Sequence, residues 1–308
     1  MEKDFHYDVI YALAKLTELD YPDVIAYASQ YVDDNSDEQF LSQEKGRGFP
    51  ERLKTRNGYY YPQMTQCRSP DAMNLFVQKY VFVPFHFLPG DNHVVIRGRT
   101  NPFTATPNSK NGKIILSRAL ESGNPCLIGI ALHTFGDSWS HQNFTGLCED
   151  WNSSALGEDL PEPMVPNIGH GEAGKKPDII SESWVDKRIG DMEITNRERA
   201  LEAAQEIYLY FQRRSRKGPS WQKVRGDFQT IMDAPDSAER GKRVKDFLGS
   251  RGNGTMPEYS RWSWVDEAID RSGNEMVVNP DFKKTPWYHF QQAAKAHLAL
   301  VVDLIKTR

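Results

Sequence analysis

Three residues with metal-binding side chains, His133, Asp137 and His141, follow one another at intervals of four. On an α-helix such positions share one face, about 6 Å apart along the axis. Imidazole and carboxylate groups are common ligands of zinc and related divalent ions. The surrounding helix is apolar on nearly every side, so burying these groups is costly unless a cation binds them. The spacing favours a metal site over the alternative, a hydrogen-bonded polar cluster without metal.

A carboxylate between two histidines has a further use. It can bridge two ions about 3.5–4 Å apart, which is the arrangement of two-metal hydrolysis. Asp137 holds that central position between His133 and His141. We therefore predict that Asp137 bridges ions and orients a water molecule.

Other segments offer more candidate ligands. His6 opens the first helix, His86 lies in an apolar stretch, and His170 lies in a long loop rich in glycine, proline and acid. Asp33 and Asp34 end the second helix, where carboxylates face the negative end of the helix dipole unless a cation compensates. Singly, each residue has an ordinary alternative as a core or surface residue. Together they supply ligands from several segments, as a metal cluster inside a helical bundle requires.

Helical periodicity runs along most of the chain and predicts an all-α, multi-helix bundle with long irregular loops. Asp20 is expected to cap the second helix, with Pro22 in its first turn. Pro84 disfavours a helix through residues 85–88. We expect one metal-binding domain over residues 1–308, with a possible helical extension from about residue 195. The helices are expected at 1–34 (as a hairpin), about 69–80, 113–121, 124–144, 195–216, 220–232, 237–248, 259–271 and 286–306.

Composition and missing motifs argue against several functional classes. The net charge is −4 and the pI about 6.1, which argues against duplex nucleic acid as a partner. Three widely spaced cysteines predict free thiols rather than a thiolate metal site. The sequence shows no signal peptide and no transmembrane run, so we expect a cytoplasmic protein. P-loop, Rossmann and serine-hydrolase motifs are also missing from the sequence.

The order of these residues resembles that of the zinc-dependent phospholipase C and single-strand nuclease superfamily. The resemblance covers about the first 180 residues, and His133-x3-Asp137 is its specific motif. It implies an all-helical fold, zinc ions, and attack of an activated water on a phosphodiester or phosphomonoester. Several short sequence segments, such as Phe85-His86-Phe87-Leu88-Pro89-Gly90, are also similar to those of an uncharacterised bacterial family. The ligands that the resemblance implies are His6, Asp33 or Asp34, His86, His133, Asp137, His141 and His170.

Departures from the superfamily pattern concern the N-terminus, the spacing of His141 after Asp137, which is closer than in many members, and the last carboxylate. The carboxylate expected four residues after His170 falls on Gly174, so Glu172 or Asp178 must replace it. Secreted members use a processed N-terminus as a ligand, whereas this chain begins with an ordinary Met1. The resemblance therefore carries over Asp178 as a candidate ligand and no N-terminal one.

The sequence thus predicts a hydrolase with two or three Zn²⁺ ions. Its substrate would be a small-molecule, lipid-headgroup or nucleotide phosphoester. Asp137 is the predicted catalytic residue together with Asp33, which acts as ligand or general base. Lys175, Lys176 and Arg188 are candidates for contact with substrate phosphate. Two alternatives stay open: a His/carboxylate iron oxygenase, and a protein in which the metals are purely structural.

Overall fold

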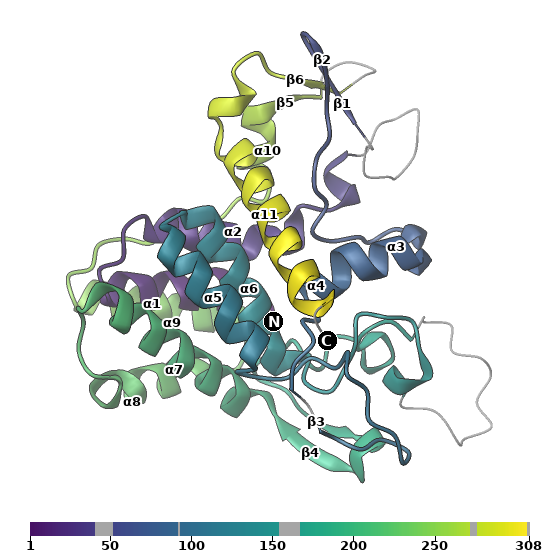
Figure 1. Cartoon of the computed structure of the whole chain (residues 1–308). Coiled ribbons are helices and arrows are strands. Elements are labelled where there is room, and N and C mark those ends of the chain that lie inside the picture. The colour runs from purple at the N-terminus through teal and green to yellow at the C-terminus, as the bar shows by residue number, and fades with distance from the viewer. Residues whose placement is uncertain (41–51, 92, 154–166, 272–275, 307–308) are drawn as a thin grey trace.

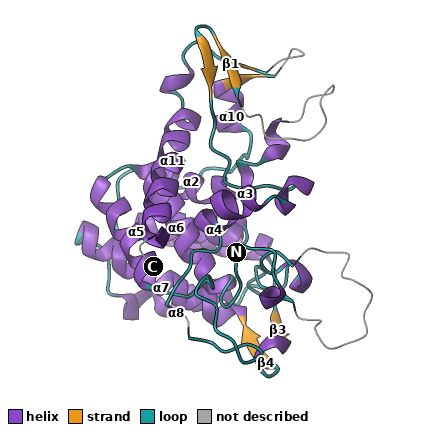
Figure 2. Cartoon of the chain, turned by 45° about the vertical axis from the view of Figure 1, so that its right-hand side comes forward, coloured by secondary structure: helices purple, strands orange, loops and turns teal. Residues whose placement is uncertain are grey.

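The structure, a computed structural model, describes residues 1–40, 52–91, 93–153, 167–271 and 276–306. It is mainly helical, as predicted (Figures 1 and 2). The α-helices are α1 (Ile10–Leu16), α2 (Pro22–Asp34), α3 (Leu75–Val77), α4 (Val83–Phe85), α5 (Lys110–Ser122), α6 (Pro125–Ser140), α7 (Asn196–Ser215), α8 (Trp221–Met232), α9 (Ser237–Ser250), α10 (Ser263–Ala268) and α11 (Pro286–Lys306).

Helix α6 lies at the centre of the bundle, where α2, α5, α7 and α11 pack around it (Figure 1). The Asn124 side chain caps its start by accepting hydrogen bonds from the backbone N–H groups of Cys126 and Leu127. Pro125 follows in the first turn, where a missing N–H costs nothing. Almost every residue of α6 is buried, so the apolar sequence around His133 and Asp137 reflects a central helix, as predicted.

Two small sheets accompany the helices. One has the strand order β2-β1-β6-β5, with β1 and β6 parallel and the other neighbours antiparallel. The other is the antiparallel pair β3–β4. The strands are β1 (Leu53–Thr55), β2 (Gly58–Tyr60), β3 (Ser183–Asp186), β4 (Met192–Thr195), β5 (Ile269–Asp270) and β6 (Val277–Val278). These strands span two to four residues, too few for an alternating pattern to stand out.

Pro84 was predicted to disfavour a helix through residues 85–88, and this is confirmed from His86 onward. The helix itself extends beyond its expected end near residue 80 and reaches Phe85. A helical run continues from α3 through a π-helical segment, Gln78–Phe82, into α4, which contains Pro84. Proline disrupts an α-helix because it lacks an N–H and its ring meets the carbonyl four residues earlier. The wider π-helical turn directly before Pro84 changes that spacing and lets the helix reach Phe85. His86 then follows at the end of this run.

Other boundaries differ in detail. Helix α2 is preceded by Tyr21 in a left-handed conformation (φ 57°) without a side-chain cap, so the predicted cap by Asp20 was wrong. Pro22 does occupy the first turn. Helix α6 ends at Ser140, so His141 is its C-terminal cap rather than a residue of the helix. The segment from about residue 195 packs back onto the early helices, since α7 contacts α1 and α6.

Within the described part of the chain, no helix has both the length and the apolar character needed to cross a membrane. Its three cysteines are free; Cys67 and Cys126 are buried and Cys148 is exposed.

Candidate metal centre

Asp137 lies at the centre of a cluster of histidines from three parts of the chain. Its Oδ1 atom is 3.0 Å from His6 Nε2, and its Oδ2 atom is 3.1 Å from both His86 Nδ1 and His133 Nε2. His141 Nδ1 lies 3.6 Å from Oδ2. All five side chains are buried. Both carboxylate oxygens are therefore surrounded by imidazole nitrogens, as expected for a bridging carboxylate.

The side chains form three groups whose ligand atoms lie close enough to hold an ion. They are His6–His133–Asp137, Asp33–His86–His133 and His141–His170–Asp178. The first two share His133, and its Nε2 atom has one lone pair. These two groups can therefore not both keep His133 as a ligand. The donor set fits two or three divalent ions, because imidazole and carboxylate suit zinc and related metals.

Backbone carbonyls fix the ring orientation of three of these histidines. His86 donates Nε2–H to Thr65 O (2.9 Å), and His170 donates Nδ1–H to Gly174 O (2.8 Å). His141 donates Nδ1–H to the carbonyl oxygen of His86 (2.9 Å). In each ring the other nitrogen faces a carboxylate: Asp137 for His86, and Asp178 for the other two. Metal-binding histidines are commonly oriented in this way, because the second hydrogen bond selects the tautomer.

His6 and His133 are held differently. Their rings stack at 4.0 Å, and among the described residues neither Nδ1 atom has a hydrogen-bond partner. Burial lowers the pKa of both histidines to about 4, helped by the Met1 ammonium for His6 and by His6 itself for His133. Both rings are therefore neutral at pH 7, and no proton has to leave before they bind a cation.

Irregular helical turns place two of these ligands. His6 lies in a π-helix, Asp4–Val9, and His86 follows the π-helical segment before α4. A buried ion pair between Asp4 and Arg240 ties the first of these turns to α9. Single π-helical turns are frequent at functional sites because they re-aim side chains.

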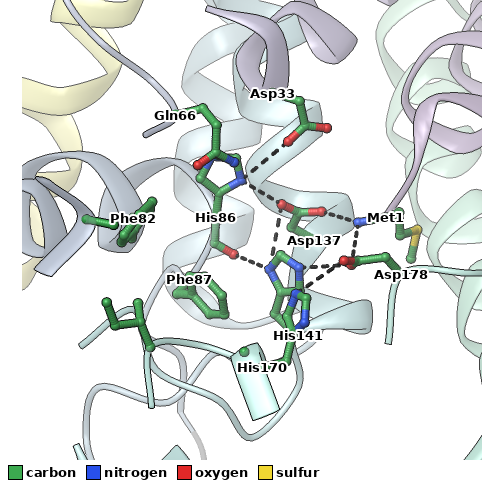
Figure 3. Close-up of a pocket in the computed structure, with 13 residues that line it drawn as sticks. Met1, Asp33, Gln66, Phe82, His86, Phe87, Asp137, His141, His170 and Asp178 are labelled. Carbon is green, nitrogen blue, oxygen red and sulfur yellow. Dashed lines mark hydrogen bonds and ion pairs between the residues drawn. The ribbon is translucent and has the colours of Figure 1, made fainter. Parts of the chain in front are cut away.

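The α-amino group of Met1 also lies in the site, which the sequence analysis missed. Its nitrogen is 2.7 Å from Asp137 Oδ1 and 3.2 Å from Asp178 Oδ1 (Figure 3). It also lies 3.1 Å from Ser140 Oγ. Burial alone would lower the pKa of this amine, but the carboxylates outweigh it and raise the pKa to about 11. The ammonium and the histidines in turn hold the Asp137 pKa well below its usual range, against the effect of burial.

Asp33 and Asp34, which the sequence left as alternatives, have different surroundings. Asp33 Oδ1 lies 3.9 Å from His86 Nδ1 and 3.8 Å from His133 Nε2. Asp34 instead accepts a hydrogen bond from the Tyr259 hydroxyl at 2.6 Å and pairs with Arg261, outside the three groups. The geometry favours Asp33 as the ligand. The prediction of Asp34 as a metal ligand was wrong, because its carboxylate faces residues of the C-terminal half of the chain.

The difference between the two aspartates can be measured. We expect Asp33→Asn to weaken binding of the ion held by His86 by about 10–100-fold, because one carboxylate ligand is lost. Asp34→Asn, one residue away, should bind the metal as wild type does. Titration calorimetry on both variants checks this. Equal losses in the two variants would contradict the assignment of Asp33.

Of the two carboxylates considered after His170, Asp178 is the one that faces the histidines. Its Oδ1 and Oδ2 atoms contact His141 (3.1 Å) and His170 (3.2 Å). The other candidate, Glu172, accepts hydrogen bonds from the Ser153 hydroxyl and belongs to none of the three groups.

The basic residues proposed for phosphate contact do not line the site. Arg188 is buried, pairs with Asp186 and lies 3.6 Å above the Phe144 ring, so that prediction was wrong for Arg188. Lys175 and Lys176 are exposed in the loop between His170 and Asp178 and stand outside the pocket lining.

The groups open into a pocket of about 350 Å³ (Figure 3). One side of it consists of candidate metal ligands, and the other is apolar. Phe87 forms part of the apolar side, and its ring stacks on His141 at 4.4 Å. The lining residues are Met1, Asp33, Gln66, Ala72, Phe82, His86, Phe87, Asp137, His141, Ile168, His170, Gly171 and Asp178.

A glycine beside His170 makes room for Phe87. Gly169 has φ +56°, and a Cβ there would lie 2.2 Å from the Phe87 ring. Gly169→Ala should therefore displace Phe87 and disturb the group formed by His141, His170 and Asp178. We expect loss of one bound ion per chain. Gly190→Ala is the matched control, because its φ is +59° and a Cβ would meet nothing within 4 Å. Metal content measures the difference, and retention of all ions in Gly169→Ala would refute this role.

Proton competition should make metal binding depend on pH. Burial lowers the pKa values of His86 and His170, but Asp137 and Asp178 outweigh it and raise them above 6.5. Both rings must lose a proton to bind an ion, so affinity should fall as pH falls. We expect about a 100-fold loss or more from pH 8 to pH 6, with proton release on binding. Calorimetry in buffers of different ionisation enthalpy counts these protons, and pH-independent affinity would contradict the prediction.

Comparison with known proteins gives one match. The model of the family of unknown function DUF6765 matches residues 1–305. Neither the search of curated proteins nor that of solved structures found a match. Because the match spans nearly the whole sequence, the chain belongs to DUF6765, a family of unknown function.

Proposed function

We propose that this protein is a metal-dependent hydrolase of phosphoesters that uses two or three Zn²⁺ ions. The observation that carries the proposal is the convergence of five histidines and three aspartates. Three of these histidines and all three aspartates line an open pocket. Catalytic metal sites leave room for water and substrate, whereas structural sites are closed and commonly use cysteine. The order of the ligands along the chain also supports a relation to the phospholipase C and single-strand nuclease superfamily.

Asp137 and Asp33 are suited to different roles in this proposal. Asp137 engages histidines with both oxygens, so it suits a bridging role and has little capacity left to accept a proton. Asp33 is 21% exposed, borders the pocket and lies almost 4 Å from its histidine neighbours. It is therefore better placed to act as a ligand that also orients or deprotonates water. Bound divalent ions supply Lewis acidity, which lowers the pKa of water and offsets phosphoryl charge.

The two alternatives are less consistent with this geometry. A His/carboxylate iron oxygenase needs one metal and three ligands, whereas the described residues form three ligand groups. A purely structural role would not need the pocket that His86, Asp137 and His170 share.

A phosphoester screen tests the proposal. Protein loaded with Zn²⁺ is assayed with p-nitrophenyl phosphate, bis(p-nitrophenyl) phosphate, a dinucleotide and a short-chain phosphatidylcholine. We expect hydrolysis of at least one ester, its loss with a chelator and its recovery with Zn²⁺. Asp137→Asn should reduce the rate by about 100-fold or more, since it removes the bridging ligand. Asp34→Asn is the matched control. Fully loaded protein that hydrolyses none of these esters would contradict the proposal, and a single bound iron would favour the oxygenase.

A further inference from the structure

The segment from Pro70 to Phe85 consists of a 3-10 helix, Pro70–Met73, and the helical run from α3 to α4, and it has two apolar faces. Its inner face packs Val77, Val81 and Phe82 into a satellite core. Its outer face carries four large apolar side chains that are exposed to solvent. We call these residues the ridge: Met73 (51% exposed), Leu75 (54%), Phe76 (64%) and Tyr80 (38%).

The ridge is a coherent surface rather than a scatter of single residues. Phe76 and Tyr80 are four residues apart in the run from α3 into the π-helical segment, so they share a side of it. Met73 ends the short 3-10 helix just before this run. The Phe76 and Tyr80 rings lie 4.7 Å apart. The inner face alone anchors the segment, so packing does not account for the ridge. Apolar surface concentrated in this way on a soluble domain marks an interaction site.

The shape and size of the ridge fit a lipid surface better than a protein partner. The segment projects outward from α4 at the right of Figure 1, so it presents a convex edge. At about 200 Å² for each large side chain, these exposed fractions amount to roughly 400 Å². A stable protein interface needs about 800 Å² from each partner. Insertion of a few side chains into a bilayer has no such requirement.

The residue types of the ridge also favour a lipid surface. Phenylalanine, tyrosine, leucine and methionine suit the boundary between headgroups and acyl chains, where a tyrosine hydroxyl stays wet. Lys79 is exposed beside Tyr80. Such a side chain can reach phosphate groups while its stem lies on apolar surface. We propose that the ridge docks this protein onto a phospholipid bilayer.

Docking would bring the pocket to the membrane. Ala72 and Phe82, from the same segment, line the pocket that contains Asp137 and His170. A bilayer held by the ridge would therefore lie close to the pocket mouth. The docking proposal does not depend on hydrolysis, because the ridge contains none of the candidate metal ligands.

Vesicle sedimentation of the metal-free, full-length protein tests the docking alone. The vesicles contain phosphatidylcholine with about one quarter phosphatidylserine. We expect wild-type protein to bind, and the double variant Leu75→Ser, Phe76→Ser to bind at least tenfold more weakly. The matched control is Val185→Ser, Met192→Ser, which removes two exposed apolar side chains from the β3–β4 hairpin. This control should bind as wild type does. Quenching of a Phe76→Trp variant by acyl-brominated lipid should report direct insertion.

Three results would overturn the proposal. Wild-type protein that stays in the supernatant at millimolar lipid would do so, as would equal binding by the ridge and control variants. A dimer that forms in solution and dissociates in the ridge variant would show instead that a second copy covers this surface. Circular dichroism confirms that both double variants are folded before binding is compared.

Discussion

Asp137→Asn is expected to remove most bound metal and to destabilise the metal-free protein by about 3–5 kcal/mol. The carboxylate is buried, and it compensates the Met1 ammonium at 2.7 Å as well as the neighbouring imidazoles. Asparagine keeps the size but not the charge, so the buried ammonium loses its closest partner. Urea unfolding of metal-free protein measures the stability change, and elemental analysis measures the metal.

Asp34→Asn is the control for this experiment. Asp34 is also buried near the end of α2, but its carboxylate contacts Tyr259 and Arg261 rather than the histidines. We expect it to keep its metal and its free energy of unfolding to fall by about 1–2 kcal/mol, since its hydrogen bonds weaken and the partly exposed ion pair with Arg261 is lost. If Asp137→Asn retained its metal and stability while Asp34→Asn did not, Asp137 would not be the centre of the site.

Gly129→Ala is expected to damage the site from a distance. A Cβ at Gly129 would lie 2.4 Å from the Ile25 carbonyl oxygen, 2.6 Å from Ala28 Cβ and 2.8 Å from Ser29 N. Two of these atoms belong to the α2 backbone and cannot move without the helix. Because α2 carries Asp33 and α6 carries His133 and Asp137, the two halves of the site should separate. We expect overpacking to lower the free energy of unfolding by about 1–3 kcal/mol and to weaken metal binding.

Gly226→Ala separates this packing effect from helix propensity. Gly226 lies inside α8, and a Cβ there would meet nothing within 4 Å. Alanine is favoured over glycine within a helix by about 1 kcal/mol, so this variant should be as stable as wild type or more so. Thermal unfolding and metal titration of both variants check the prediction. A Gly129→Ala protein with unchanged stability and affinity would show that the close approach of α2 and α6 does not set the ligand geometry.

Much of the helical framework could be predicted because it rests on local patterns. The long apolar run in residues 124–144 predicted a buried helix, and the structure contains one. The His133–Asp137 spacing places both side chains on one face of that helix, where they meet at 3.1 Å. The approach of Asp33 to His133 depends on long-range packing, which local patterns do not reveal. Asp33 faces His133 only because α2 packs closely against α6 at Gly129.

Other parts of the site depend on features without a sequence signal. The π-helical turns around His6 and before His86 break the regular helical period, and the helix before His86 extends beyond its expected end near residue 80. The carbonyl groups that orient His86 and His170 belong to Thr65 and Gly174, and any residue supplies a carbonyl. The superfamily pattern does include an N-terminal ligand, but the sequence analysis discounted the amine of Met1 because secreted members use a processed N-terminus.

One measurement tests the central claim most directly. The protein is purified without added metal or chelator, and the metal per chain is determined by elemental analysis for wild type and Asp137→Asn. The three ligand groups predict two or three zinc ions per wild-type chain, most of them lost in the variant. Well-folded wild-type protein with no metal above background would contradict the account and leave a buried polar cluster of histidines and aspartates.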